Sequence, residues 1–236
     1  MFQSQNKSYF SILLLFLLLL GCIFRFFKDP LLSASLPASA LSSPKPVVIL
    51  DAGHGGPDPG KVSTKGTLEK DLNLSITLKI KELLSSHNLT VILTRDSDRD
   101  LATEESDRKM SDLNNRIALI KKYSPDLVVS IHQNSYPDSS VIGAQCFYYK
   151  DSATGERLAR LLQEKIINLT EQTKIREIKN NESYYLLKYS PATTAIVECG
   201  FLSSPEEEEL LLSPDYQEKI AAAVSQAILE YLQLPG

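Results

Sequence analysis

The stretch PVVILDAGHGG, residues 46–56, indicates the class of fold. Its apolar part, Val47 to Leu50, lies between Pro46 and a glycine-rich turn, which is the pattern of a short strand. Every position of the run is apolar, and such a strand is typical of a parallel sheet that is covered on both faces. We therefore expect a buried strand whose carboxyl end leads into a polar turn.

Similar apolar runs recur along the chain and alternate with helical patterns. The further expected strands are residues 90–93, 127–131, 143–149 and 194–197. The expected helices are residues 69–84, a helix that stops at Ser124, residues 152–168, a short helix capped by Ser203 or Ser204 with Pro205 in its first turn, and residues 215–232. The inward positions of the first two helices are expected to be Leu72, Ile76, Ile80 and Leu83, then Leu113, Ile117 and Ile120. Residues 170–189 fit neither pattern.

This alternation predicts the architecture. Strands that alternate with helices form an α/β fold, here a single domain with a mainly parallel twisted sheet and helices on both faces. The 190 residues from 47 to 236 are enough for one good core and too few for two comfortable domains. A functional site in such a fold is expected at the carboxyl ends of the strands.

The N-terminal segment differs from the rest in composition. Residues 9–24 contain no charged side chain, a run at the short end of what crosses a bilayer. An uncleaved anchor is favoured over a cleaved signal, because the only Ala-x-Ala site, residues 38–40, lies well past the run. A lipoprotein signal ending at Cys22 ranks last. The expected division is a membrane anchor or signal segment at 1–28, a Ser/Ala/Pro-rich linker at 29–46 and a folded domain at 47–236.

Charge and cysteine content exclude some functions. Residues 1–46 hold four of the basic side chains and one acidic one, so the remainder carries 21 basic and 28 acidic side chains, a net charge of −7. With no Lys/Arg cluster to offset that balance, nucleic-acid binding is excluded. Cys146 and Cys199 could form one disulfide, but their apolar surroundings favour buried free thiols.

Polar side chains gather just past the expected strands. They are Asp51 and His54 after the first, Thr94 and Arg95 after the second, His132 and Asn134 after the third, and Glu198 at the end of the fifth. Because parallel strands end at one edge of a sheet, we expect these side chains to lie close together. His87 lies at a helix end instead and is given no role.

Glu69 shares the inward stripe of its helix with Leu72 and Ile76. A buried carboxylate needs a cation partner, although an N-terminal Glu can also be half exposed and favoured by the helix dipole. Together with His54 and His132 it forms a His/Glu/His set with an open fourth position, the ligand pattern of a catalytic zinc site. Taken singly, each residue has an ordinary explanation, such as pairing of Glu198 with Arg95. The run Glu206–Glu209 is expected to be a solvated helix start.

Four motifs in order resemble a known family. They are DAGHGGPDPG (51–60), GTLEKDLNL (66–74), VVSIHQNS (128–135) and AIVECGFLSSPEEEELL (195–211). Together they are similar to the zinc-dependent N-acetylmuramoyl-L-alanine amidases of the amidase-3 family. The resemblance implies that His54, Glu69 and His132 bind Zn²⁺ and that Glu198 is the catalytic carboxylate. Asp51, Arg95 and Asn134 are candidates for supporting the ligands or contacting substrate.

The resemblance extends to the germination-specific amidases of spore-forming bacteria. A single catalytic domain behind an apolar segment is similar to theirs, as is SIHQNSYPDSSVIGAQCFYY (130–149). It implies cleavage of peptidoglycan between the lactyl group of N-acetylmuramic acid and L-alanine, in spore cortex maturation toward muramic-δ-lactam. The location implied is the outer face of a bacterial membrane, with the protein anchored or secreted into the wall or the forespore intermembrane space. A protein activator or a co-acting deacetylase is a partner compatible with this role.

Some features differ from the family pattern. Gln133, Ser135 and Ala52 replace more usual residues and affect the expected subsite preference. The chain passes from Tyr149 almost directly into the helix at Ser152, which leaves little room for the inserted helix that covers the zinc site in some relatives. Control by time and place of synthesis, or by a partner, is therefore our hypothesis. The alternatives are a zinc peptidase or deacetylase of the wall, and a catalytically silent wall-binding or regulatory domain, which would be expected to lack a ligand or Glu198.

Overall fold

A computed structural model describes residues 44–171 and 174–235, and a six-stranded sheet runs through this part of the chain. The strands are β1 (Val47–Ala52), β2 (Thr90–Leu93), β3 (Leu127–Asn134), β4 (Gln145–Tyr148), β5 (Lys179–Asn180) and β6 (Thr193–Phe201). Their order in the sheet is β2-β1-β3-β6-β4-β5. Only the β4–β6 pair is antiparallel within the described ranges, so the predicted mainly parallel sheet is confirmed.

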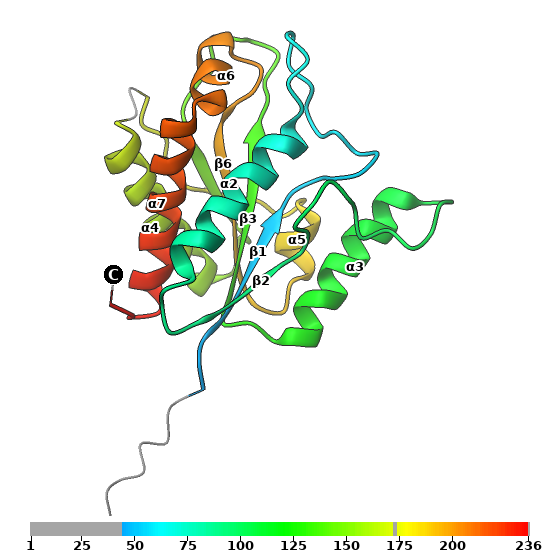
Figure 1. Cartoon of the computed structure of the whole chain (residues 1–236), viewed down its shortest axis with the longest axis vertical. Helices are drawn as coiled ribbons and strands as arrows, with labels where there is room; N and C mark the ends of the chain where they lie inside the picture. The colour runs from blue at the N-terminus through cyan, green and yellow to red at the C-terminus, as the bar shows by residue number, and fades with distance from the viewer. Residues whose placement is uncertain (1–43, 172–173, 236) are drawn as a thin grey trace, which may run out of the picture. The chain divides into compact units, whose positions relative to one another are not determined.

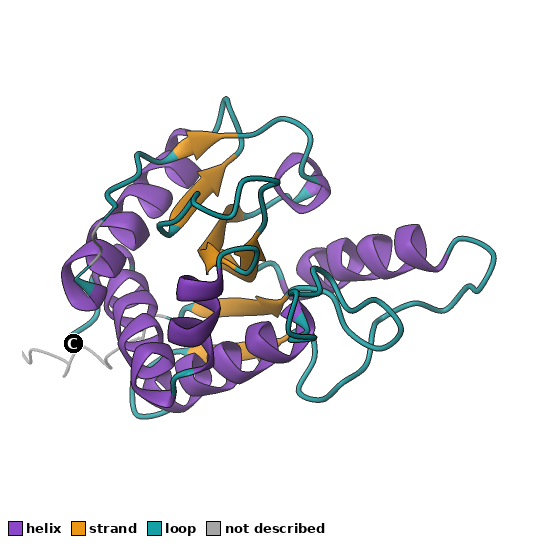
Figure 2. Ribbon diagram, turned by 90° about the horizontal axis from the view of Figure 1, so that it is seen from above, coloured by secondary structure: helices purple, strands orange, loops and turns teal. Residues whose placement is uncertain are grey.

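Helices cover both faces of the sheet, as the continuous apolar strands predict (Figures 1 and 2). The helices are α2 (Glu69–Leu84), α3 (Arg108–Tyr123), α4 (Ala153–Thr170), α5 (Tyr185–Tyr189), α6 (Pro205–Leu212) and α7 (Pro214–Tyr231). One face packs against α2, α4 and α7 in the main hydrophobic core. The other face packs against α3 and α5 through a smaller core that includes Ile49, Ile117 and Val128.

Two sequence-based expectations about the helices need correction. Leu83 is 44% exposed, and Leu84 is fully buried in its place. The buried stripe Leu72–Ile76–Ile80 advances four residues at each step, and the same step leads to Leu84. Helix α3 begins at Arg108, although the charged stretch from Asp96 to about Ser111 favours a loop, because the side chain of Asp107 caps the helix by accepting from the backbone N–H of Met110.

The segment that the sequence left unassigned contains short elements. Strand β5 has only two residues and helix α5 only five, too few for a periodic pattern. Both cysteines of the domain are buried free thiols, as the sequence favoured. No helix among the described residues is long and apolar enough to cross a membrane. The predicted anchor at 1–28 and most of the linker at 29–46 lie outside the described residues.

Candidate metal centre

Three parallel strands bring the predicted site residues to one edge of the sheet. β1 ends at Ala52, so His54 lies in the turn that follows this strand. His132 lies within β3. β3 and β6 pair in parallel, with His132 opposite Glu198 and an irregularity in the register just beyond. Glu69 is the first residue of α2, which packs against β1 and β3.

His54, Glu69 and His132 form a compact cluster. Their candidate ligand atoms all lie within 4.8 Å of one another. Nδ1 of His132 is 2.9 Å from one carboxylate oxygen of Glu69, and Nε2 of His54 is 3.3 Å from the other. Two imidazoles and one carboxylate that converge in this way are a donor set that fits Zn²⁺.

Glu69 is buried, not half exposed, and its carboxylate has many hydrogen-bond donors. It accepts from the backbone N–H groups of Lys61 at 2.8 Å and Gln133 at 3.1 Å, and from the Asn73 side-chain amide at 3.2 Å. Burial alone would raise its pKa, but hydrogen bonds and charge from His132 and His54 hold the pKa well below its usual range. Glu69 is therefore a carboxylate, the form that binds a metal ion.

Asp58 orients His54, and the sequence analysis did not assign it a role. Its Oδ2 lies 2.8 Å from Nδ1 of His54, while its other oxygen accepts from the backbone N–H of Gly60 at 3.0 Å. This contact leaves Nε2 of His54 facing Glu69, which is the usual arrangement of a carboxylate behind a metal-binding imidazole. The signal for Asp58 was its place four residues after His54, but the contact depends on how the turn closes.

Two glycines allow the ligands to approach closely. A Cβ at Gly53 would lie 2.2 Å from Cε1 of His132, so the imidazole rests directly on the backbone of that residue. A Cβ at Gly60 would lie 2.6 Å from Oε2 of Glu69 and 2.7 Å from Cδ2 of His54. Side chains at either position would displace a candidate ligand.

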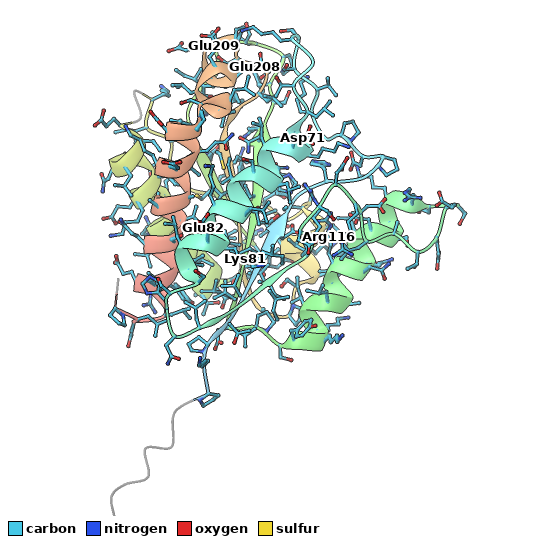
Figure 3. The ribbon with its side chains drawn as sticks, viewed as in Figure 1. Asp71, Lys81, Glu82, Arg116, Glu208 and Glu209 are labelled. Carbon is cyan, nitrogen blue, oxygen red and sulfur yellow. The ribbon has the colours of Figure 1, made fainter. Side chains whose placement is uncertain are left out.

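Two buried arginines hold the turn that carries His54. Arg95 donates to the carbonyls of Ala52 and Gly53, and Arg116 donates to those of Ala52 and His54. Figure 3 shows Arg116 on the side of α3 that faces the sheet. Sequence analysis named Arg95 but missed Arg116, whose helical position alone gives no sign of this contact.

Asp51 neutralises Arg116 beneath the turn. It forms a buried ion pair with Arg116 and accepts from Ser130 Oγ at 2.5 Å and Thr94 Oγ1 at 2.8 Å. Burial raises the pKa of this carboxyl, but Arg116 and the two hydroxyl donors outweigh burial and bring the pKa to about 2. Asp51 and Arg95 are 2% and 1% exposed, so they support the ligand turn from below.

Glu198 lies beside the cluster with an unused oxygen. It is 7% exposed, and its Oε2 is buried with no hydrogen-bond partner among the described residues. Burial raises the pKa of Glu198 to about 7, with a further increase from Glu69 and an opposing effect from His132 and His54. The alternative pairing with Arg95 is wrong, because the guanidinium of Arg95 donates to backbone carbonyls. A carboxyl with this pKa can exchange a proton near neutral pH.

A cavity of about 470 Å³ opens over these residues. Its lining includes His54, Glu69, His132 and Glu198, together with Asn134. Residues 183–186, which lead into and begin α5, also line it, so the segment that the sequence left unassigned contributes to the site. The remaining lining residues are Lys109, Leu113, Gln133, Ser135 and Ile196.

The acidic run at the start of α6 is only partly solvated, which corrects the sequence-based expectation. Glu206 and Glu209 are exposed, but Glu207 and Glu208 are buried. Glu207 accepts from the backbone N–H groups of Phe201 at 2.6 Å and Gly143 at 2.9 Å. Glu208, which is labelled on α6 in Figure 3, accepts from the hydroxyls of Ser63 at 2.5 Å and Thr67 at 2.6 Å.

These two carboxylates therefore stabilise the two chain segments that flank the site. Glu208 fixes the loop that leads into Glu69, and Glu207 fixes the chain just past Glu198. Helix-start carboxylates are also favoured by the dipole, which is why the sequence pattern could not distinguish the exposed members from the buried ones.

Comparison with known proteins assigns most of the chain to one family. The family model described as N-acetylmuramoyl-L-alanine amidase matches residues 48–230. The germination-specific N-acetylmuramoyl-L-alanine amidase of Bacillus subtilis is 39% identical over 194 residues, which cover 80% of this chain and 81% of that protein. The AmiA amidase of Escherichia coli is 26% identical, with coverage of 86% and 83%.

Solved structures give the same result for the fold. The CwlD amidase from Clostridioides difficile, in complex with the GerS lipoprotein, has a TM-score of 0.77 and 41% identity, covering 80% of this chain and 99% of that one. An N-acetylmuramoyl-L-alanine amidase from Clostridium difficile 630 has a TM-score of 0.73 and 30% identity, with coverage of 82% and 100%.

Proposed function

This chain belongs to the N-acetylmuramoyl-L-alanine amidase family, and from that premise we propose that its site hydrolyses peptidoglycan with a zinc ion held by His54, Glu69 and His132. The bond cleaved is the amide between the lactyl group of N-acetylmuramic acid and L-alanine. The observation that carries the proposal is the convergence of these three side chains beside Glu198, whose buried Oε2 has no partner among the described residues.

Zinc binding and proton transfer are carried out by different residues in this proposal. A zinc ion in this donor set supplies a Lewis acid and lowers the pKa of a water ligand toward neutrality. Glu198 accepts a proton from the attacking water and donates a proton to the departing nitrogen of L-alanine. Asp58 keeps Nε2 of His54 directed at the ligand cluster, and Arg95 and Arg116 keep the backbone of that turn in place.

The proposed setting is the spore cortex. The similarity to the germination-specific enzyme of Bacillus subtilis supports removal of stem peptides from muramic acid there, toward muramic-δ-lactam. Action on the cell wall takes place outside the membrane, and we propose that residues 1–28 attach the chain to the membrane or direct its export, with residues 29–46 as a spacer. The similar amidase of Clostridioides difficile is in complex with a lipoprotein, which supports a protein partner for this chain as well.

The test is incubation of the purified protein with vegetative and cortex peptidoglycan, with zinc supplied or chelated. We expect zinc-dependent appearance of new L-alanine amino termini together with muramic acid that carries no peptide. Release of acetate instead would identify a deacetylase, and cleavage of peptide bonds within the stem peptide would identify a peptidase. Either result would refute the amidase proposal. No release from either material, even with a partner lipoprotein added, would favour a silent binding domain.

A further inference from the structure

Lys109 occupies a particular place in the wall of the site. It is the second residue of α3 and lines the 470 Å³ cavity together with His54 and Glu198. It also lines two smaller cavities. One, of about 70 Å³, is lined by His54 as well, and the other, of about 240 Å³, is lined by Asp58 and Arg108. Lys109 therefore stands where these three cavities meet, at the side of the candidate metal cluster.

The ammonium group of Lys109 has no anionic partner within the described ranges. The adjacent Arg108 differs, because Asp100 and Glu105 both pair with it. No salt bridge or hydrogen bond joins the side chain of Lys109 to any described residue, although its charge makes a small contribution, after that of His54, to the lowered pKa of Asp58. The charge on Lys109 is thus available to a molecule that enters the cavity.

The fold gives no reason for a cation at this position. Lys109 is exposed, and it lies in the first turn of α3, where the helix dipole disfavours positive charge. Within the described part of the chain, the other charged residues that line the cavity are Glu69, Glu198 and the two histidines. Lys109 is consequently the one permanently cationic side chain in that lining, in a domain whose net charge is negative.

We propose that Lys109 determines substrate specificity by binding the free carboxylate of the acidic residue that follows L-alanine in the stem peptide. This inference rests on the proposed amidase function and deepens it. The stem peptide departs from the scissile bond as an anionic chain, so a cation at the side of the cluster distinguishes the peptide side of the substrate from the uncharged glycan side. The contact does not change during hydrolysis, so it contributes to binding and is expressed in KM, not in kcat.

The experiment compares two muramyl-peptide substrates that differ in a single group. One carries the free carboxylate on the residue after L-alanine, and the other carries the corresponding amide. The full-length enzyme, Lys109→Met and Lys109→Glu are assayed on both, with zinc content and melting temperature measured for each. Lys121→Met is the matched control, because Lys121 lies on the same helix in its last turn, away from the cavity lining.

We expect wild type and Lys121→Met to prefer the acid over the amide by about three- to tenfold in kcat/KM, through KM. Lys109→Met should bring this ratio close to one, and Lys109→Glu should reverse it, while zinc content stays unchanged. The preference of the wild type should shrink at high ionic strength, as it does for exposed charge pairs.

Two results would overturn the inference in distinguishable ways. An acid-to-amide ratio in Lys109→Met equal to that of wild type would show that Lys109 does not bind this carboxylate, while the amidase function would stand. Failure of wild type to release L-alanine amino termini from both substrates and from whole peptidoglycan would refute the proposed function itself, and the specificity role with it.

Discussion

His132 on β3 and Glu198 on β6 are opposite each other in the register of two parallel strands. Neighbouring strands lie about 4.8 Å apart, so this register alone brings a candidate metal ligand next to a candidate proton carrier. Glu198 is not one of the three clustered ligand residues, and its Oε2 has no hydrogen-bond partner among the described residues. This arrangement supports the proposal that metal binding and proton transfer belong to different side chains.

Glu198→Gln tests this division. The amide keeps the size of the side chain but cannot accept a proton, so turnover should fall by about 10²- to 10⁴-fold. Zinc content should remain that of the wild type, because Glu198 is not among the clustered ligands. Near-normal turnover would show that another group is the general base, and loss of zinc would place Glu198 among the ligands.

Asp58→Asn tests the support of His54. The carboxylate that faces Nδ1 increases the basicity of the imidazole and fixes its orientation, and loss of such a partner typically weakens metal binding by about 10- to 100-fold. Competition with a chromophoric chelator measures this affinity. Asp151→Asn, at an exposed position without any role in the site, is the control, and equal zinc affinity in the two variants would exclude the positioning role of Asp58.

The sequence predicted the ligand cluster for a clear physical reason. The expected strands end just before His132 and Glu198, and parallel strands bring such positions to one edge of a sheet. In the structure β3 and β6 run on to Asn134 and Phe201, so both residues lie in the carboxyl-terminal halves of their strands. Glu69 was placed by its helical stripe. Asp58, Arg116 and Glu208 could not be assigned in this way, because each acts on a loop or turn whose path is set by tertiary contacts.

The unassigned wall of the cavity has a similar explanation. Helix α5 and strand β5 are too short to show a hydrophobic period, so residues 170–189 gave no signal of their own. Leu83 was misplaced because positions three and four residues beyond Ile80 both lie near the buried stripe of α2, and only packing distinguishes Leu83 from Leu84.

The buried pair of Asp51 and Arg116 should make stability depend on acid pH. The pKa of Asp51 is about 2 in the folded protein, below the ordinary value of 3.8. The ionised carboxylate therefore contributes its full stabilisation above pH about 4 and loses it as the pH falls through about 2. This loss amounts to about 2 kcal/mol of unfolding free energy.

Asp51→Asn removes that titration and leaves Arg116 buried without its charge partner. Unfolding free energy at neutral pH should fall by about 3–5 kcal/mol. Urea unfolding of the zinc-free protein between pH 2 and 7 measures both effects. The variant should show a smaller decline in stability below pH about 4 than the wild type. An identical decline would mean that protonation of Asp51 is not the cause of the acid-dependent loss.

Glu208→Gln tests whether α6 holds the loop before Glu69. Glu208 is 1% exposed and accepts from both Ser63 and Thr67. The amide of the variant can still accept from these hydroxyls, but it carries no negative charge. Hydrogen bonds to a charged group contribute about 1.5–3 kcal/mol, so we expect a loss of about 1–3 kcal/mol in unfolding free energy. Glu209→Gln is the matched control, because Glu209 pairs with Lys65 in solvent and an exposed pair contributes about 0–1 kcal/mol. Equal melting temperatures for the two variants would show that the buried carboxylate does not stabilise this loop.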